Sequence, residues 1–313
     1  MATKPRILFM GTPAFALPAL EMLHGSGYPI AAVVTQPDRP AGREKKETAP
    51  PVKQMAQKFG LTVLQPASVK DPSFLEALGT ARPDLVVVAA FGQILPKAVL
   101  DFPPLGCLNI HPSLLPAYRG AAPINWSIIR GEKQTGVTIM LMDEGMDSGD
   151  ILTQEQTLIG RTETYGELHD RLALQGAALL VRTIDQVVSG AARRQKQDPS
   201  RATFAPRLNR ETGRIRWRHS AGDIVNLIRG LNPSPAAYAL LEGRDLKIFT
   251  AAAGPGSPQE PPGFVASATP EGLPVAASDG YVVLKEVQLA GKKRMPVFDF
   301  LRGFTMRPGI LLE

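Results

Sequence analysis

The stretch Arg6-Ile7-Leu8-Phe9-Met10-Gly11-Thr12-Pro13 decides how the first half of the chain is interpreted. Its apolar run is typical of a strand buried on both faces, and its last three residues predict a turn. An amphipathic helix is predicted next, at residues 15–23. Further strands are predicted at residues 31–35, 61–64, 85–90, 108–111 and 136–141, with helical patterns between them. This alternation predicts an α/β fold, a doubly wound and mostly parallel sheet with helices on both faces.

The length and texture of the chain predict two domains. At 313 residues it exceeds the size at which one hydrophobic core keeps growing. A long helix is expected over residues 168–188, and the polar residues 190–206 that follow it are interpreted as a linker. Short strands, turns and a segment rich in proline and glycine at residues 254–263 come next. We therefore expect an α/β domain over residues 1–189 and a smaller, OB-like β-barrel domain over residues 207–313.

Composition limits the partners and the compartment. The single cysteine, Cys107, excludes an intrachain disulfide framework and a thiolate metal cluster, which suits a reducing cytosol. The four histidines have no metal-type spacing, so no bound metal is expected. The longest apolar run, residues 85–91, is strand-sized, and residues 11–13 interrupt the first apolar run too early for a secretion signal. We expect a cytoplasmic protein without a membrane partner, and a monomer.

The net charge of +6 is unevenly distributed along the chain. Residues 1–189 contain 17 Lys and Arg against 18 Asp and Glu, whereas residues 190–313 contain 18 against 11. This difference indicates that the C-terminal part faces a polyanion, for which nucleic acid is the obvious candidate. A solvated basic surface without a partner would give the same count. Trp217, which lies among several arginines, fits a position in the core or one facing RNA.

The turn at residues 11–13 stands where a dinucleotide-binding fingerprint would lie, but the pattern Gly-x-Gly-x-x-Gly is absent. No acidic residue closes the second strand either, because Gln36-Pro37-Asp38 follows it. A nicotinamide cofactor is therefore disfavoured. A tight strand-to-helix turn is sufficient to explain Gly11.

Asn109 and His111 are the first candidates for chemistry. Strand alternation puts both side chains on one face at the carboxyl end of a strand, where ligands bind in open α/β sheets. An amide and an imidazole so placed can donate hydrogen bonds to one developing oxyanion, and a histidine can also act as acid or base. Asp143 and Asp147, which follow the strand at 136–141, could bring a carboxylate to the same end of the sheet. A buried structural histidine and a solvated acidic turn would show the same spacing, which leaves both interpretations open.

A longer signature lies in the run Cys107-Leu108-Asn109-Ile110-His111-Pro112-Ser113-Leu114-Leu115-Pro116-Ala117-Tyr118-Arg119-Gly120. It resembles the signature of the folate-dependent formyltransferases, and residues 135–138 with 142–150 resemble its second half. Five flanking stretches resemble the corresponding regions of family members that act on a charged tRNA. These stretches are residues 35–43, 202–206, 213–215, 228–233 and 298–301. The likeness extends along nearly the whole chain. It implies a Rossmann-like formyltransferase domain and a tRNA-binding C-terminal domain.

The resemblance also implies a reaction. The formyl donor is 10-formyltetrahydrofolate, and the acceptor is the α-amino group of methionine on initiator methionyl-tRNA, which serves translation initiation. The amine attacks the formyl carbon and gives a tetrahedral oxyanion. Asn109 and a protonated His111 are expected to stabilise this oxyanion, while Asp147 orients and charges His111. No metal and no covalent enzyme intermediate are required.

The resemblance further implies where folate binds. The residues expected to contact it are Phe91, Gly92, Gln93, Ile94 and Leu95 after the central strand, Ser113, Leu114, Leu115 and Pro116 in the signature, and Asp143. Without the resemblance, residues 91–95 would be a routine strand-to-helix turn. Ser113 and Cys107 are rival nucleophiles, but neither has the spacing of a recognisable triad, and Cys107 is interpreted as strand packing.

Four basic residues, Arg39, Arg43, Lys45 and Lys46, lie in a loop that is longer than usual for a strand-helix connection. The resemblance implies that this loop contacts tRNA, where arginine can bind phosphates or bases. The alternative is a mobile, solvated run of charges. The basic C-terminal part favours a nucleic-acid partner, because both features would meet the same polyanion.

Three other functions are alternatives to this hypothesis. A formyltransferase acting on an amino sugar or another small amine would share Asn109, His111 and Asp147, but it would have no use for the basic loop and the basic C-terminal part. A hydrolase that releases formate from the same folate would also keep these three residues. A non-catalytic nucleic-acid-binding protein would not need them.

Overall fold

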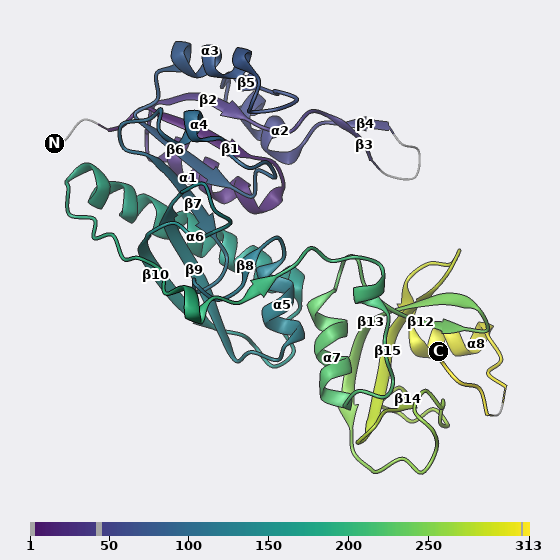
Figure 1. The fold of residues 1–313 in the computed structure, drawn as a ribbon. Helices are drawn as coiled ribbons and strands as arrows, with labels where there is room; N and C mark the ends of the chain where they lie inside the picture. Colours follow the sequence, from purple (N-terminus) through teal and green to yellow (C-terminus); the bar gives the residue numbers. More distant parts are fainter. Residues whose placement is uncertain (1–3, 42–45, 308) are drawn as a thin grey trace. The chain divides into compact units, whose positions relative to one another are not determined.

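The computed structural model describes residues 4–41, 46–307 and 309–313, and the chain divides into two compact units (Figure 1). The first unit comprises Met1–Gly120, Thr135–Thr157 and His169–Phe204, and the second comprises Ala121–Gln134, Leu158–Leu168 and Ala205–Glu313. Two short segments from early in the sequence therefore belong to the second unit. The domain boundaries at residues 189 and 207 stay a prediction.

A seven-stranded sheet forms the centre of the first unit, in the order β10-β9-β7-β6-β1-β2-β5. Its strands are β1 (Ile7–Gly11), β2 (Ile30–Val34), β5 (Val63–Leu64), β6 (Leu85–Ala89), β7 (Cys107–His111), β9 (Gln134–Leu141) and β10 (Ile151–Leu158). The five strands from β7 to β5 are parallel to their neighbours, whereas β9 is antiparallel to β7. The predicted α/β fold with a mostly parallel sheet is confirmed.

Alternate residues of these strands pack into different layers. Leu8, Val86 and Cys107 belong to one hydrophobic cluster, together with side chains of α3. On the other face of β7, Ile110 lies against Gly176 of α6. A Cβ atom added to Gly176 would lie 2.7 Å from Cγ2 of Ile110. Burial on both faces explains why β1 and β6 are continuously apolar. The helices are α1 (Leu17–Gly25), α2 (Pro51–Lys58), α3 (Pro72–Ala81), α4 (Lys97–Leu100) and α6 (Tyr165–Val188).

The second unit is built on a five-stranded antiparallel sheet in the order β12-β13-β15-β14, with β16 also paired to β15. The strands are β12 (Ala237–Leu241), β13 (Arg244–Gly254), β14 (Leu273–Ala276), β15 (Tyr281–Leu289) and β16 (Met295–Pro296), and the helices are α5 (Pro123–Ile129), α7 (Ala221–Gly230) and α8 (Val297–Gly303). The side chain of Asn125 in α5 donates to the main-chain oxygen of Gly230 in α7 at 2.8 Å. This buried hydrogen bond helps to explain why an early helix belongs to the later unit.

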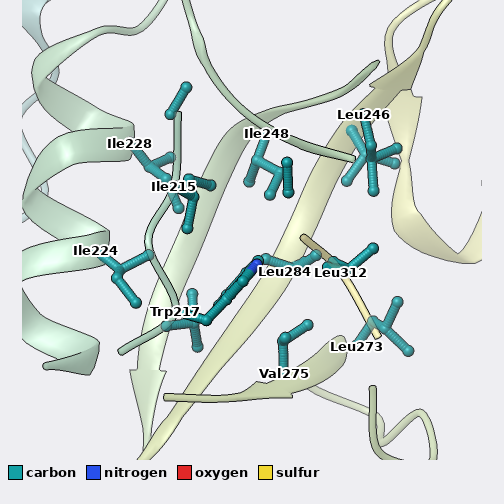
Figure 2. Packing of buried hydrophobic residues seen from close by; sticks show 14 of the residues in the cluster. Ile215, Trp217, Ile224, Ile228, Leu246, Ile248, Leu273, Val275, Leu284 and Leu312 are labelled. Carbon is teal, nitrogen blue, oxygen red and sulfur yellow. The ribbon is translucent and has the colours of Figure 1, made fainter. Parts of the chain in front are cut away.

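The core of the second unit lies between α7 and the sheet (Figure 2). Ile224 and Ile228 of α7 pack in one cluster with Ile248 of β13 and Leu284 of β15. Trp217 lies in the same cluster and is 4% exposed, which makes it a core residue. In the described residues, no helix combines the length and apolarity that crossing a membrane requires.

Several short elements complete the two units. They are β3 (Arg39–Ala41), β4 (Lys46–Thr48), β8 (Arg119–Gly120), β11 (Phe204–Ala205), and 3-10 turns at Ala14–Ala16, Pro199–Arg201 and Glu211–Gly213. Of these, β3 and β4 form an antiparallel hairpin within the stretch that the sequence presented as a loop. The stretch interpreted as a loop therefore contains two three-residue strands that pair with each other outside the main sheet.

Candidate active site

His111 is held at the carboxyl end of β7 from both sides of its ring. The side chain is 4% exposed. Nε2 lies 3.0 Å from the main-chain oxygen of Tyr118, and since a carbonyl only accepts, Nε2–H is the donor. Nδ1 lies 3.6 Å from Oδ1 of Asp147. Both ring nitrogens therefore face oxygen acceptors, an arrangement that is complementary to an imidazolium with an N–H on each nitrogen.

Asp147 is fixed by the main chain of the signature run. Its Oδ2 atom accepts a hydrogen bond from the backbone N–H of Gly120 at 2.8 Å. Its backbone has a φ of 50°, in the left-handed region that residues with a Cβ seldom adopt. Because one carboxylate oxygen is held by Gly120, the other is the oxygen nearest to the imidazole of His111.

Asn109 lies two residues before His111 on the same face of β7, level with Val88 of β6 and Met140 of β9. The residue is 8% exposed. No described residue forms a hydrogen bond with its carboxamide. A buried amide normally has partners, so this unused donor is ready to bind a ligand group.

Asp147 reaches His111 through a loop that follows an antiparallel strand. The sequence suggested only that residues following the strand at 136–141 could bring a carboxylate to the same end of the sheet as His111. However, β9 is antiparallel to β7, so its last residue, Leu141, lies opposite Leu108 near the amino end of β7. The loop after β9 returns along β7, beginning where the N–H of Met142 donates to the oxygen of Cys107. The carboxylate arrives through this returning loop.

A pocket of about 150 Å³ lies beside Asp147. Its lining consists of Gln93, Ile94, Leu95, Met140, Met142 and the loop residues 143–147. Two apolar side chains at the pocket are unusually exposed, Ile94 at 71% and Met146 at 62%. Exposed apolar surface beside carboxylates suits a flat ring system that carries N–H donors.

The predicted folate residues are only partly brought to this pocket. Gln93, Ile94, Leu95 and Asp143 line it. Phe91 is 2% exposed, and its main-chain oxygen accepts a hydrogen bond from the Thr12 hydroxyl at 3.1 Å, which fixes the start of the loop. Gly92 follows with a φ of 89°, a conformation that favours glycine. In the signature, Leu114 and Pro116 are half-buried, whereas Leu115 is buried.

Neither rival nucleophile is placed for covalent chemistry. The hydroxyl of Ser113 is fully buried and donates to the main-chain oxygen of Ala117 at 2.6 Å. Cys107 is 1% exposed, and its Sγ atom lies 3.7 Å from the oxygens of Val99 and Leu100. Burial raises the pKa of the Cys107 thiol to about 12, with a smaller contribution from the charge of Asp101. Both side chains therefore serve packing.

Comparison with known proteins assigns the chain to a family. The sequence model described as "Formyl transferase" matches residues 5–184, and "Formyl transferase, C-terminal domain" matches residues 207–305. The chain belongs to the formyl transferase family. Over the described residues, no three His, Cys, Asp or Glu side chains are grouped so that they could hold a metal ion.

Relatives of this formyl transferase match it along its whole length. A methionyl-tRNA formyltransferase of Syntrophus aciditrophicus is 58% identical over 309 residues, which are 99% of both chains. The enzyme of the same name from Geotalea uraniireducens is 48% identical over 98% of this chain and 97% of its own.

Solved structures share the fold at low sequence identity. The sugar 3N-formyl transferase WlaRD has a TM-score of 0.67 and 17% identity over 93% of this chain and all of its own. HypX from Aquifex aeolicus, in complex with tetrahydrofolic acid, has a TM-score of 0.66 and 17% identity. The match covers 96% of this chain and 47% of HypX, so this formyl transferase corresponds to about half of that longer protein.

Of the four predicted tRNA-binding residues, Arg39 is the first residue of β3 and Lys46 the first residue of β4. Arg39 is exposed, and its guanidinium donates to the side-chain oxygen of Gln36 at 3.2 Å. Arg43 and Lys45 lie outside the described residues. The side chain of Lys46 is not described. The hairpin follows Asp38, whose carboxylate accepts hydrogen bonds from the ammonium of Lys53 at 2.7 and 2.8 Å. These bonds lower the pKa of Asp38.

The sequence does not show which residues hold the site together. The signature run contains Tyr118 and Gly120, whose main-chain atoms contact His111 and Asp147, but nothing in their side chains indicates this. Gln197 was not predicted to belong to the site either. This buried residue lies in the predicted linker, and its side chain donates a hydrogen bond to the loop that carries Asp147. No motif surrounds Gln197, and only the fold brings it to the site.

Proposed function

We propose that this formyl transferase moves the formyl group of 10-formyltetrahydrofolate to the α-amino group of methionine on initiator methionyl-tRNA. The observation that carries the choice of acceptor is the 58% identity, over 99% of both chains, with a relative named for that reaction. The geometry of Asn109, His111 and Asp147 supports the chemistry. The chain would accordingly act in translation initiation, in the cytoplasm, as a monomer.

The pocket beside Asp147 fits the folate donor. The exposed surfaces of Ile94 and Met146 would pack against the faces of its ring system. The carboxylates of Asp143 and Glu144, in the same lining, would accept hydrogen bonds from ring nitrogens. When bound, the donor supplies the formyl carbon that the amine attacks. We extend the folate site to Phe91, Gly92 and residues 113–116, of which Leu115 packs in one cluster with Met140 of the pocket lining.

The side chains of the site would stabilise negative charge that develops on the formyl oxygen. The carboxamide of Asn109 has no partner among the described residues and can donate to that oxygen. Since Nε2–H of His111 is bonded to Tyr118, Nδ1–H is the second donor. The carboxylate of Asp147, 3.6 Å from Nδ1, stabilises the charged ring. Fixed donors of this kind usually provide the largest single contribution to acyl-transfer catalysis.

The acceptor must also lose a proton as it attacks, and the folate nitrogen must gain one as it leaves. His111 is the only histidine in the site and can relay this proton, directly or through water. The lack of an accessible thiol or hydroxyl at Cys107 and Ser113 favours direct transfer from donor to amine. Direct transfer requires both substrates to be bound together.

The nature of the acceptor separates the proposal from the alternative. An enzyme for an amino sugar would need the same three site residues, and the fold likeness to WlaRD is compatible with either acceptor. The exposed Arg39 and the excess of basic residues after position 190 favour a polyanionic acceptor.

The test is direct. Purified protein is incubated with 10-formyltetrahydrofolate and initiator tRNA charged with radiolabelled methionine, and formylmethionine is measured after mild hydrolysis. We expect rapid formylation. A parallel reaction supplies an amino-sugar nucleotide instead, and a third omits the acceptor and follows formate release. Formylation of the sugar alone would replace the proposed acceptor, and formate release without an acceptor would indicate a hydrolase.

A further inference from the structure

Gln197 connects the predicted linker to the loop that carries Asp147. The residue is 9% exposed, and its Nε2 donates to the main-chain oxygens of Asp147 and Gly149, both at 2.8 Å. Its Oε1 accepts from Nε of Arg119 at 3.0 Å and from a terminal guanidinium nitrogen at 2.7 Å. Carbonyl oxygens only accept and a guanidinium only donates, so these partners allow one orientation of the amide.

We propose that Gln197 is a positioning residue for formyl transfer, acting through the carboxylate of Asp147. The inference rests on the proposed function. Asp147 has a φ of 50°, which a residue with a Cβ keeps only when its surroundings hold it. The two N–H groups of Gln197 bind the carbonyls on either side of Ser148 and so hold the turn. Arg119 in turn keeps the amide from rotating.

The position of Asp147 matters because its contact with His111 is not a tight one. At 3.6 Å, Nδ1 and Oδ1 attract each other as charges but lie beyond hydrogen-bond length, so a small shift of the loop changes the interaction. Gly120 holds the other carboxylate oxygen from the side of the signature run. Gln197 holds the main-chain oxygen of Asp147, at the backbone end of that residue. Together they fix the carboxylate relative to the imidazole.

Gln197 is not needed to attach its own segment to the first unit. Two residues earlier, Gln195 exchanges backbone hydrogen bonds with Ile151 at 2.8 and 2.9 Å. One residue later, the Asp198 side chain accepts from the N–H of Ser200 at 2.9 Å and begins a turn. Because these contacts involve other residues, replacing the Gln197 side chain should leave the path of the segment in place.

The test is a double-mutant cycle between Gln197→Met and Asp147→Asn, assayed by formylation of methionyl-tRNA. Methionine has a similar length but no polar atoms. We expect Gln197→Met alone to lower kcat by about tenfold or more, with both KM values within about threefold of wild type. In the Asp147→Asn background the same substitution should change kcat by less than about twofold, because the residue it positions has lost its charge. Gln195→Met, the same substitution at an exposed side chain two residues away, serves as the control and should match wild type.

Unchanged kcat in Gln197→Met, or an equal loss in both backgrounds, overturns the inference. Thermal unfolding of each variant is measured first. If Gln197→Met unfolds at the assay temperature, Gln197→Glu replaces it, since a carboxylate still accepts from Arg119 but has no N–H for the two carbonyls. If wild type formylates an amino-sugar nucleotide and not methionyl-tRNA, the proposed acceptor fails while the cycle, run with the sugar, still decides the role of Gln197. If the wild-type protein transfers formyl to neither acceptor, both the proposed function and the proposed role of Gln197 fail.

Discussion

Nδ1 of His111 lies 3.6 Å from Oδ1 of Asp147, while Nε2 of the same ring donates to the oxygen of Tyr118. Nε2 of the imidazole is therefore hydrogen-bonded to the main chain, whereas Nδ1 faces the carboxylate. In the proposed mechanism, Nδ1 is therefore the atom that acts on a substrate. The distance between Nδ1 and the carboxylate exceeds hydrogen-bond length, which leaves Nδ1 available to a substrate.

The first prediction concerns this pair. His111→Ala and Asp147→Asn should each lower kcat for formylation by at least about a hundredfold, because each removes part of the charge stabilisation. The measurement is steady-state formylation of methionyl-tRNA. Asp170→Asn is the matched control, since Asp170 is also paired with a histidine, His169 at 2.8 Å, but its side chain is 82% exposed. Near-normal turnover in either site variant would refute the mechanism.

The second prediction concerns the unused amide of Asn109. Asn109→Leu keeps the branched shape of the side chain and removes both N–H donors, so we expect a loss of about 10²- to 10³-fold in kcat. The loss should fall on kcat rather than on KM for folate, because the oxygen gains its charge only as the reaction proceeds. Single-turnover assays with saturating donor measure this. A variant that raises KM and keeps kcat would show that Asn109 binds the ground state instead.

The sequence predicted much of the first unit because its central parallel strands are apolar on both faces and helical patterns follow them. Ile7 to Met10 and Leu85 to Ala89 are such strands, and both lie where they were expected. It did not show the direction of β9, because an antiparallel strand at this place has the same apolar pattern as a parallel one. The path of the loop that carries Asp147 depends on that direction.

The β3–β4 hairpin and Gln197 escaped prediction for different reasons. Strands of three residues are too short for alternation to be recognised, so the hairpin looked like a loop. Gln197 lies in a polar stretch, and its role depends on two main-chain oxygens about fifty residues earlier in the sequence. Contacts between a side chain and a distant main chain leave no pattern in the sequence.

The third prediction concerns Cys107. Burial raises the pKa of its thiol to about 12, above the ordinary value of 9.0, so the native thiol stays protonated at pH 8. We expect the folded protein to react with a thiol reagent such as dithionitrobenzoate far more slowly than the unfolded chain does. Between pH 9 and about 12 the unfolded thiol ionises and the native one does not, so the free energy of unfolding should fall as pH rises. Cys107→Ala should lack this contribution and keep its activity.

The fourth prediction concerns the basic hairpin. Binding of methionyl-tRNA should weaken steeply with added salt, because phosphate contacts release bound counterions. Arg39 is exposed and anchored by Gln36, so Arg39→Ala should weaken binding and lower the slope of log K against log salt by about one. Lys58→Ala removes the same charge from an exposed position in the last turn of α2 and serves as the control. The measurement is filter binding of charged tRNA over a range of salt concentrations. An affinity that does not depend on salt would exclude an electrostatic role for the hairpin, and an equal effect of Lys58→Ala would mean that net charge, and not the position of Arg39, determines binding.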